Sequence, residues 1–263
     1  LLLLSLIFLS IGSLSSVLIY RLPMMEMKIN GINLFFPRSH CPECKKDISL
    51  FFLMPLIGFL VQRGRCKKCK KPISKLYFFN EIIHLSAGLA LFYYFGISIF
   101  FFVTYLLFFI FYILFILDYK LFYLPLYLNL SVAVVGFFAN SVFNLYTKNI
   151  SEIFGITSFM YSLIGFCIGY LSLWIVNFFY KTMYKKDGIG GGDFILFGGI
   201  GTIIGPLALA PVLFIGSLSA ILIISTQPKK FKREIPLGSG LILGLYVFIS
   251  LKYFELFENI LVI

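Results

Sequence analysis

Residues 156–180 read ITSFMYSLIGFCIGYLSLWIVNFFY and contain no charged side chain. An apolar run of about 20 residues is long enough for an α-helix to cross the hydrocarbon core of a bilayer. Similar runs recur on both sides of this stretch, and 60% of the whole chain is hydrophobic while only 13% is charged. This composition excludes an ordinary soluble domain, and we predict an all-α membrane protein.

The hydropathy pattern on either side of this stretch predicts a polytopic bundle of about eight transmembrane helices. We expect the short, glycine-rich sixth segment to be tilted or to cross only part of the bilayer. We interpret the first segment as a retained helix and not a removed signal peptide, because it lacks a small-residue cleavage site. The eight segments lie at residues 1–20, 77–96, 98–117, 124–146, 156–180, 194–205, 207–226 and 236–260.

The positive charges indicate how these segments are oriented. The chain carries a net charge of +11, and 12 of its 22 Lys and Arg residues lie between Arg21 and Lys75. If loop 21–76 is cytoplasmic, eight spans place all basic residues except Lys148 and Lys252 on the cytoplasmic side, including a cluster at residues 229–233. This distribution favours contact with anionic lipid head groups over nucleic acid.

Four cysteines form a pattern typical of a metal site. Cys41 and Cys44 make one Cys-x2-Cys pair, and Cys66 and Cys69 make a second. Two such knuckles can offer four thiolates to one tetrahedral Zn²⁺, which would be structural because every ligand position is filled. Two disulfides or free thiols are the alternatives, and a cytoplasmic loop argues against disulfides. We expect the fifth, Cys167, to be a small buried residue.

These features divide the chain into three parts. We expect residues 1–20 to form the first transmembrane helix, residues 21–76 a cytoplasmic loop domain that binds zinc, and residues 77–263 a second transmembrane domain, which holds the aspartates described next. Within the loop, the apolar stretch 51–61 is too short to span a bilayer. We expect it to lie on the membrane face or to cover the metal site.

Two aspartates stand out at the inner ends of predicted spans, Asp118 and Asp193. A carboxylate at the edge of a bilayer is costly and therefore suggests a functional site. Two carboxylates at the same depth could face each other and hydrolyse a peptide bond as an acid–base dyad. The alternatives are an interfacial carboxylate paired with Lys120 and, for Asp193, a helix N-cap.

Three glycines directly precede the second aspartate. Gly190, Gly191 and Gly192 favour neither helix nor strand. They allow close approach of another helix or of an extended peptide backbone. We therefore predict that they lie where a substrate backbone approaches the dyad.

Seven sequence elements follow one another along nearly the whole chain: residues 21–23 (RLP), 37–44 (PRSHCPEC), 63–69 (RGRCKKC), 72–74 (PIS), 118–125, 188–194 (GIGGGDF) and 235–238 (IPLG). In this order they resemble the bacterial type IV prepilin peptidases, which are intramembrane aspartyl proteases. Three positions differ from the pattern of many members: Leu126 replaces Asp or Asn, Ile195 replaces Lys, and Ser239 replaces Pro.

The resemblance implies a function. Members remove the basic leader from type IV prepilins and pseudopilins, after a glycine, at the cytoplasmic face of the bacterial inner membrane. Many also methylate the new N-terminal amine with S-adenosylmethionine. Asp118 and Asp193 match the catalytic pair, and the four cysteines match the loop of members with both activities. The competing interpretation is a non-enzymatic zinc-knuckle scaffold or transporter, with the aspartates on an ion path or capping helices.

Overall fold

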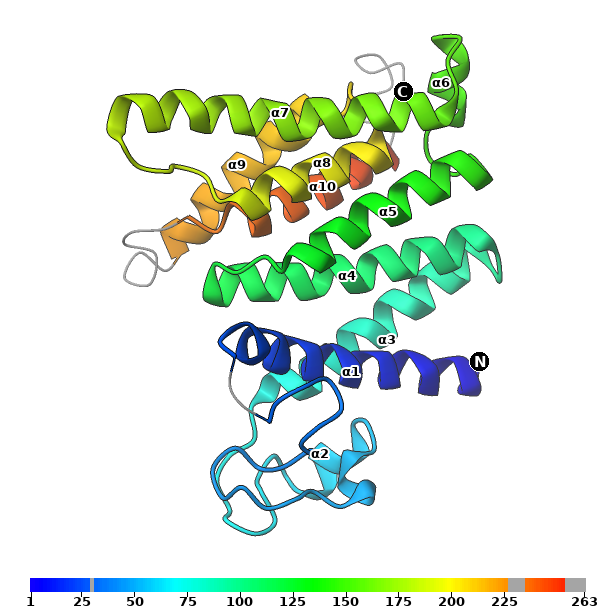
Figure 1. Cartoon of the computed structure of the whole chain (residues 1–263). Coiled ribbons are helices and arrows are strands. Elements are labelled where there is room, and N and C mark those ends of the chain that lie inside the picture. The colour runs from blue at the N-terminus through cyan, green and yellow to red at the C-terminus, as the bar shows by residue number, and fades with distance from the viewer. Residues whose placement is uncertain (29–30, 227–234, 254–263) are drawn as a thin grey trace. The chain divides into compact units, whose positions relative to one another are not determined.

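A computed structural model describes residues 1–28, 31–226 and 235–253 (Figure 1). The chain forms two compact units, Leu1–Phe109 and Ile110–Ile263, and the division falls inside helix α4 (Ile99–Leu121). Within the described residues, helices are joined by loops, and β-structure is limited to isolated bridges. The all-α fold class is thereby confirmed, whereas the three-part division of the sequence stays a prediction.

The described residues include five helices that are long and apolar enough to cross a membrane. These are α1 (Leu2–Glu26), α3 (Lys75–Phe95), α4, α5 (Leu126–Phe143) and α7 (Ser158–Tyr184). Three shorter apolar helices follow, α8 (Gly191–Ile204), α9 (Leu209–Thr226) and α10 (Leu237–Tyr253).

Each of the eight predicted segments therefore contains an apolar helix, but within the residues that the structure describes fewer than eight of these helices reach spanning length. Helix α8 has 14 residues. At about 1.5 Å per residue it extends roughly 21 Å, less than the ~30 Å core of a bilayer. The basic cluster 229–233, and the part of segment 236–260 that follows Tyr253, lie outside the described residues.

In the first unit, α1 and α3 pack with their backbones in close contact. A side chain at Gly12 would place its Cβ 2.6 Å from the Cα of Glu81, so only glycine fits there. A buried hydrogen bond from Asn80 Nδ2 to Ser16 Oγ, 2.8 Å long, joins the same two helices. Aromatic side chains of α1 and the first part of α4 complete the core: Phe8, Phe101 and Tyr105.

Two charged side chains hold the loop after α1 against these helices. The buried guanidinium of Arg21 donates to the carbonyl oxygens of Asn33 (2.8 Å) and Pro37 (2.6 Å). The Glu81 carboxylate accepts the backbone N–H of Leu56 at 2.7 Å. Buried charges need such partners, because an unpaired charge in an apolar interior is strongly unfavourable.

The apolar stretch 51–61 forms two short helical segments, η1 (Leu50–Leu53) and α2 (Ile57–Val61). The Lys67 ammonium of the second cysteine knuckle lies 4.9 Å from the ring centre of Phe52. The ring of Phe59 lies 5.3 Å from that of Phe78 in α3. The stretch therefore contacts both the second knuckle and a membrane helix.

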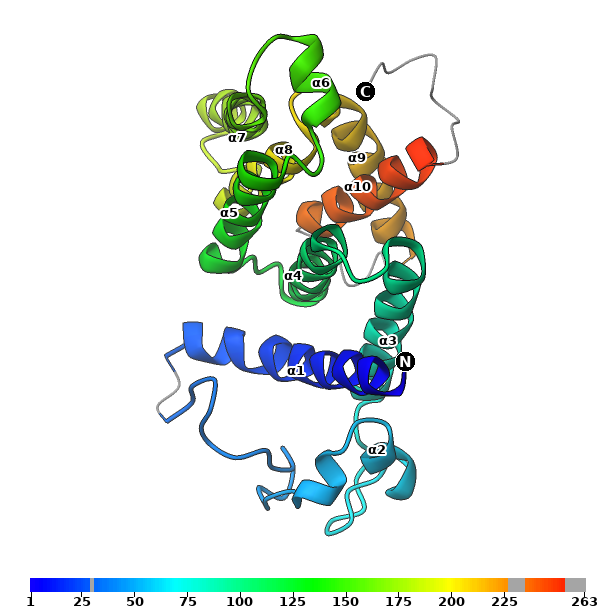
Figure 2. The same cartoon turned by 90° about the vertical axis from the view of Figure 1, so that its right-hand side faces the viewer.

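In the second unit, α8 is the central helix. Every residue from Phe194 to Ile203 except Ile195 is buried. Helices α5 and α7 pack on either side of it, as Figures 1 and 2 show, while α9 packs on α10. A Cβ at Gly165 of α7 would overlap the carbonyl oxygen of Gly201 in α8, and the reverse also holds. Glycine therefore sets the spacing between α7 and α8.

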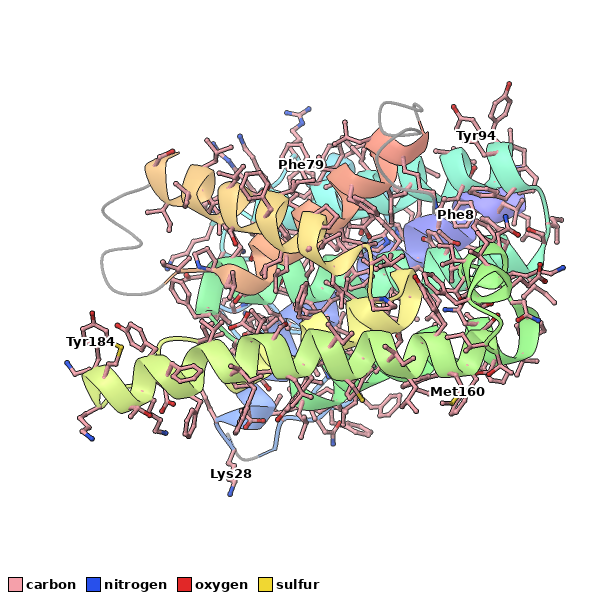
Figure 3. The ribbon with its side chains drawn as sticks, turned by 90° about the horizontal axis from the view of Figure 1, so that it is seen from above. Phe8, Lys28, Phe79, Tyr94, Met160 and Tyr184 are labelled. Carbon is pink, nitrogen blue, oxygen red and sulfur yellow. The ribbon has the colours of Figure 1, made fainter. Side chains whose placement is uncertain are left out.

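Helix α7 presents an apolar outer face, with Met160 near one end and Tyr184 at the other (Figure 3). Cys167 is also exposed on this helix, so the prediction that it is buried is wrong. Lipid is as apolar as a helix-bundle interior, and composition alone does not separate the two environments. Exposed apolar residues of this helix include Phe159, Ile164, Ile168, Leu171, Ile175 and Phe178.

Candidate active site and metal centre

Asp118 lies in the last turn of α4 and is almost completely buried, with 4% of its surface exposed. Its Oδ2 accepts two hydrogen bonds from Ser239, at 2.5 Å from the backbone N–H and 2.7 Å from the hydroxyl. Within the described part of the chain, both hydrogen bonds to this carboxyl group end on Oδ2. These two hydrogen bonds do not involve the other oxygen, Oδ1.

Asp193 lies in the first turn of α8. The N-cap is Gly190, so the alternative that Asp193 itself is the N-cap is wrong. The amides of Gly190 and Gly238 lie close enough to interact with its carboxyl group. Its Oδ1 is buried and has no hydrogen-bond partner among the described residues. A helix N-terminus favours a negative group at this position.

The two carboxyl groups belong to one site. They are close enough to interact electrostatically. The C-terminal end of α4 and the N-terminal ends of α8 and α10 lie at the same end of the second unit (Figure 1). A Cβ at Gly238 would lie 3.2 Å from Asp118 Cγ, and one at Gly192 would lie 2.8 Å from Leu124 Cβ. The absence of side chains at these glycines lets the three segments converge.

The three glycines before Asp193 have different surroundings. Gly192 packs tightly, whereas a Cβ at Gly191 would meet nothing within 4 Å. A Cβ at Gly190 would lie 3.2 Å from Asp193 Oδ2, its one close neighbour among the described atoms. Gly192 thus serves helix packing, and Gly191 leaves an open side at the start of α8. Their approach to a substrate backbone stays a prediction.

Two buried or partly buried asparagines, which the sequence analysis did not single out, fix the backbone around Asp193. Asn129 Nδ2 of α5 donates to the carbonyl oxygen of Gly192 at 3.1 Å. Asn177 Oδ1 of α7 accepts the backbone N–H groups of Gly188 (2.8 Å) and Ile189 (3.0 Å). The sequence does contain a sign of both residues, since each is an isolated amide side chain in an apolar helix. Burying such a side chain is unfavourable unless it forms hydrogen bonds.

The four predicted metal ligands lie together. The Sγ atoms of Cys41, Cys44, Cys66 and Cys69 all lie within 4.8 Å of one another, and the cysteines are free. The Sγ atoms of Cys41 and Cys69 are 3.8 Å apart. A tetrahedral site with Zn–S bonds of about 2.3 Å needs sulfur atoms about 3.8 Å apart, so the cluster could hold a metal ion.

Hydrogen bonds around the thiols also suit metal binding. The backbone amides of Cys69 and Lys68 lower the pKa of the Cys66 thiol to about 6, whereas burial and the neighbouring thiols raise the pKa of Cys69 to about 11. Metal ions bind the thiolate and not the thiol, so the environment of Cys66 favours the ligand form. A lowered pKa thus reduces the competition between protons and metal at neutral pH.

The two knuckles repeat the same local fold. Cys41 donates its N–H to the carbonyl of Lys46 (3.0 Å), and Cys66 donates likewise to Lys71 (2.9 Å). The sequence pattern Cys-x2-Cys-Lys-Lys occurs in both knuckles, at residues 41–46 and 66–71, and accounts for their common fold. The residue that follows each knuckle has a left-handed backbone, namely Lys45 and Lys70.

Two known family profiles match the regions that contain the residues of both sites. The sequence profile of the bacterial peptidase A24 N-terminal domain matches residues 6–95, and that of the type IV leader peptidase family matches residues 105–225. The chain is 32% identical to a prepilin leader peptidase/N-methyltransferase of Legionella pneumophila, over 89% of this chain and 87% of that protein.

A protein of the same name from Vibrio cholerae serotype O1 is also 32% identical, over 96% of this chain and 97% of that protein. Another from Klebsiella pneumoniae is 32% identical, over 81% of this chain and 88% of that protein. No solved structure matches the chain.

Proposed function

This chain belongs to the type IV leader peptidase family, and we propose that it cleaves the leader from type IV prepilins or pseudopilins and methylates the new N-terminus. The observation that carries the proposal is the convergence of Asp118 and Asp193 inside the region matched by the peptidase profile. The Ser239 hydrogen bonds leave Asp118 Oδ1 unused, and Asp193 Oδ1 has no hydrogen-bond partner in the described part of the chain. The relatives' names combine the same two activities.

The two aspartates act as a general acid–base pair. One carboxylate takes a proton from water, whose oxygen then bonds to the scissile carbonyl carbon. The other carboxyl group, protonated, donates a hydrogen bond to the carbonyl oxygen. When the C–N bond breaks, a proton passes to the departing amine, and the pair returns to its singly protonated state. Two neighbouring carboxyl groups share one proton readily, because both cannot be charged at close range.

The cysteine cluster supports the proposal of a structural zinc ion. Cys41, Cys44, Cys66 and Cys69 would fill all four positions of Zn²⁺, leaving none for substrate. The ion would stabilise the fold of the loop between α1 and α3. S-adenosylmethionine would supply the methyl group.

Charge and surface support a location in the inner membrane, with the active site near the cytoplasmic face. The loop between α1 and α3 carries most of its charge as Lys and Arg, as cytoplasmic loops do. The exposed apolar face of α7 suits contact with lipid. The non-enzymatic alternative, a scaffold or transporter, has no support in the comparisons, because the relatives are named as enzymes.

An intact-mass measurement tests both activities. The protein, purified in detergent, is mixed with a prepilin that has a Gly–Phe junction, with and without S-adenosylmethionine. We expect a product that has lost the leader and gains one methyl group only when S-adenosylmethionine is present. An unchanged mass, with a substrate that another peptidase of the family cleaves, would contradict the proposal. Cleavage without the methyl increment would limit the function to proteolysis.

A further inference from the structure

We propose that Ser239 is a positioning residue for proteolysis, which holds the Asp118 carboxyl group by Oδ2 and leaves Oδ1 for the reaction. This inference rests on the proposed function. Ser239 is fully buried, and both its N–H (2.5 Å) and its hydroxyl (2.7 Å) donate to the same oxygen of Asp118. The carbonyl oxygen of Phe115 is a second, more distant acceptor for the hydroxyl, at 3.2 Å. Neither the spacing of motifs nor the match to relatives assigns it a role.

At the start of α10, the backbone N–H of Ser239 has no partner within its own helix and can therefore donate to Asp118. The first backbone hydrogen bond of the helix comes from Gly240, whose N–H donates to the carbonyl of Pro236 at 3.1 Å. The N–H groups of the first helical turn have no partner within their own helix. The amide of Ser239 is one of these groups, and it finds its partner in Asp118 at the end of α4.

The contact also fixes the orientation of the carboxyl group. Two donors that reach one oxygen from different directions restrict rotation about the bond between Cβ and the carboxyl carbon. The backbone at Gly238 closes one side of the carboxyl group, since a Cβ there would lie 3.2 Å from Asp118 Cγ. Hydrogen bonds to a carboxylate are about twice as strong as neutral ones, and burial of Asp118 strengthens them further.

The function of this arrangement is to hold the dyad ready before substrate binds. Hydrolysis requires that the reacting atoms and the catalytic oxygens be held within about 0.5 Å of the productive geometry. A carboxyl group that rotates freely would spend only part of its time in the productive orientation. Ser239 should therefore affect the chemical step and have little effect on the binding of prepilin.

Three variants test the role of Ser239. Ser239→Ala removes the hydroxyl and keeps the amide, while Ser239→Cys keeps the amide and offers a weaker S–H donor. Ser250→Ala is the matched control, since Ser250 is exposed in the same helix and its hydroxyl donates to the carbonyl of Tyr246 in its own helix. The measurements are kcat and KM for prepilin cleavage in detergent, together with the unfolding temperature of each variant.

We expect kcat to fall about tenfold in Ser239→Ala and about threefold in Ser239→Cys, with KM unchanged. Ser250→Ala should match the unmodified protein. A kcat for Ser239→Ala within twofold of the unmodified protein would overturn the inference, as would a rise in KM at constant kcat. If the unmodified protein cleaves and Ser239→Ala cleaves equally well, only this inference fails. If the unmodified protein does not cleave, the proposed function fails.

Discussion

The cysteine cluster and the aspartate pair are built in opposite ways. The outermost ligands, Cys41 and Cys69, lie 28 positions apart, and each knuckle is closed by hydrogen bonds between near neighbours. Asp118 and its partner Ser239 lie 121 positions apart and are joined by helix packing. A site of the first kind depends on local turns, whereas a site of the second kind depends on the distances between helices. Substitutions that change helix packing should therefore impair the aspartate pair and leave the cysteine cluster unchanged.

Among the substitutions outside the aspartate pair, the largest effect should follow from Gly201→Ala. A Cβ at this position would overlap the carbonyl oxygen of Gly165, and a helix backbone does not move aside easily. Overpacking of this kind destabilises a protein by about 3 kcal/mol. We expect a lower unfolding temperature in detergent and at least a hundredfold loss of cleavage, while the zinc content stays the same.

Gly191→Ala is the control in the same helix, because a Cβ there would meet nothing within 4 Å. It should fold as the unmodified protein does. Equal destabilisation by both substitutions would contradict the close packing of α7 on α8.

Removal of the metal should impair the cysteine cluster and largely preserve cleavage. In the double variant Cys66→Ser, Cys69→Ser, two of four thiolate ligands are lost, so zinc measured by atomic absorption should fall close to zero. Cleavage should stay within about tenfold of the unmodified protein, because the dyad belongs to the second unit. Complete loss of cleavage, with the membrane helices still folded, would show that the two sites are not independent.

A smaller effect is expected from Asn177→Ala. The substitution removes the acceptor for the Gly188 and Ile189 amides and frees the backbone that leads to Asp193. We expect cleavage to fall about tenfold, in line with the loss of one or two such bonds. Ser172→Ala is the control in α7, since its hydroxyl donates to the carbonyl of Gly169 in its own helix. An unchanged rate for Asn177→Ala would show that this loop needs no such support.

The sequence predicted the residues of both sites better than it predicted their surroundings. Cysteine spacing was sufficient to bring four thiols together, because knuckles are local structures. Asp118 and Asp193 stood out because acidic residues are rare at the ends of apolar segments. Their catalytic role stays a prediction. Ser239 drew notice only as a departure from a family pattern with proline, which has neither an N–H nor a hydroxyl to donate. Its contact with Asp118 depends on the packing of α4 and α10, which periodicity does not specify.

The smallest effect should follow from Lys71→Ala. Lys71 forms an exposed ion pair with Glu43 and so links the two knuckles. The hydrogen bond from Lys71 lowers the pKa of Glu43, so the pair contributes at neutral pH and its contribution is lost as pH falls through that lowered pKa. Exposed pairs contribute little, and we expect zinc retention against a chelator at pH 7 to change less than about threefold. A larger change would show that charge, and not only the thiols, holds the knuckles together.

The most direct test of the dyad compares three substitutions of the same kind: Asp118→Asn, Asp193→Asn and Asp187→Asn. The third is the control, because Asp187 is exposed and lies six residues before Asp193. Its carboxylate pairs with Lys181 and accepts a hydrogen bond from Asn177, from both of which an asparagine oxygen can still accept hydrogen bonds. In the prepilin assay, we expect the first two to lower the rate at least a thousandfold, with unchanged unfolding temperatures, and the control to stay within threefold. Cleavage at the unmodified rate by either Asp118→Asn or Asp193→Asn would contradict the central claim that these two carboxyl groups carry out the hydrolysis.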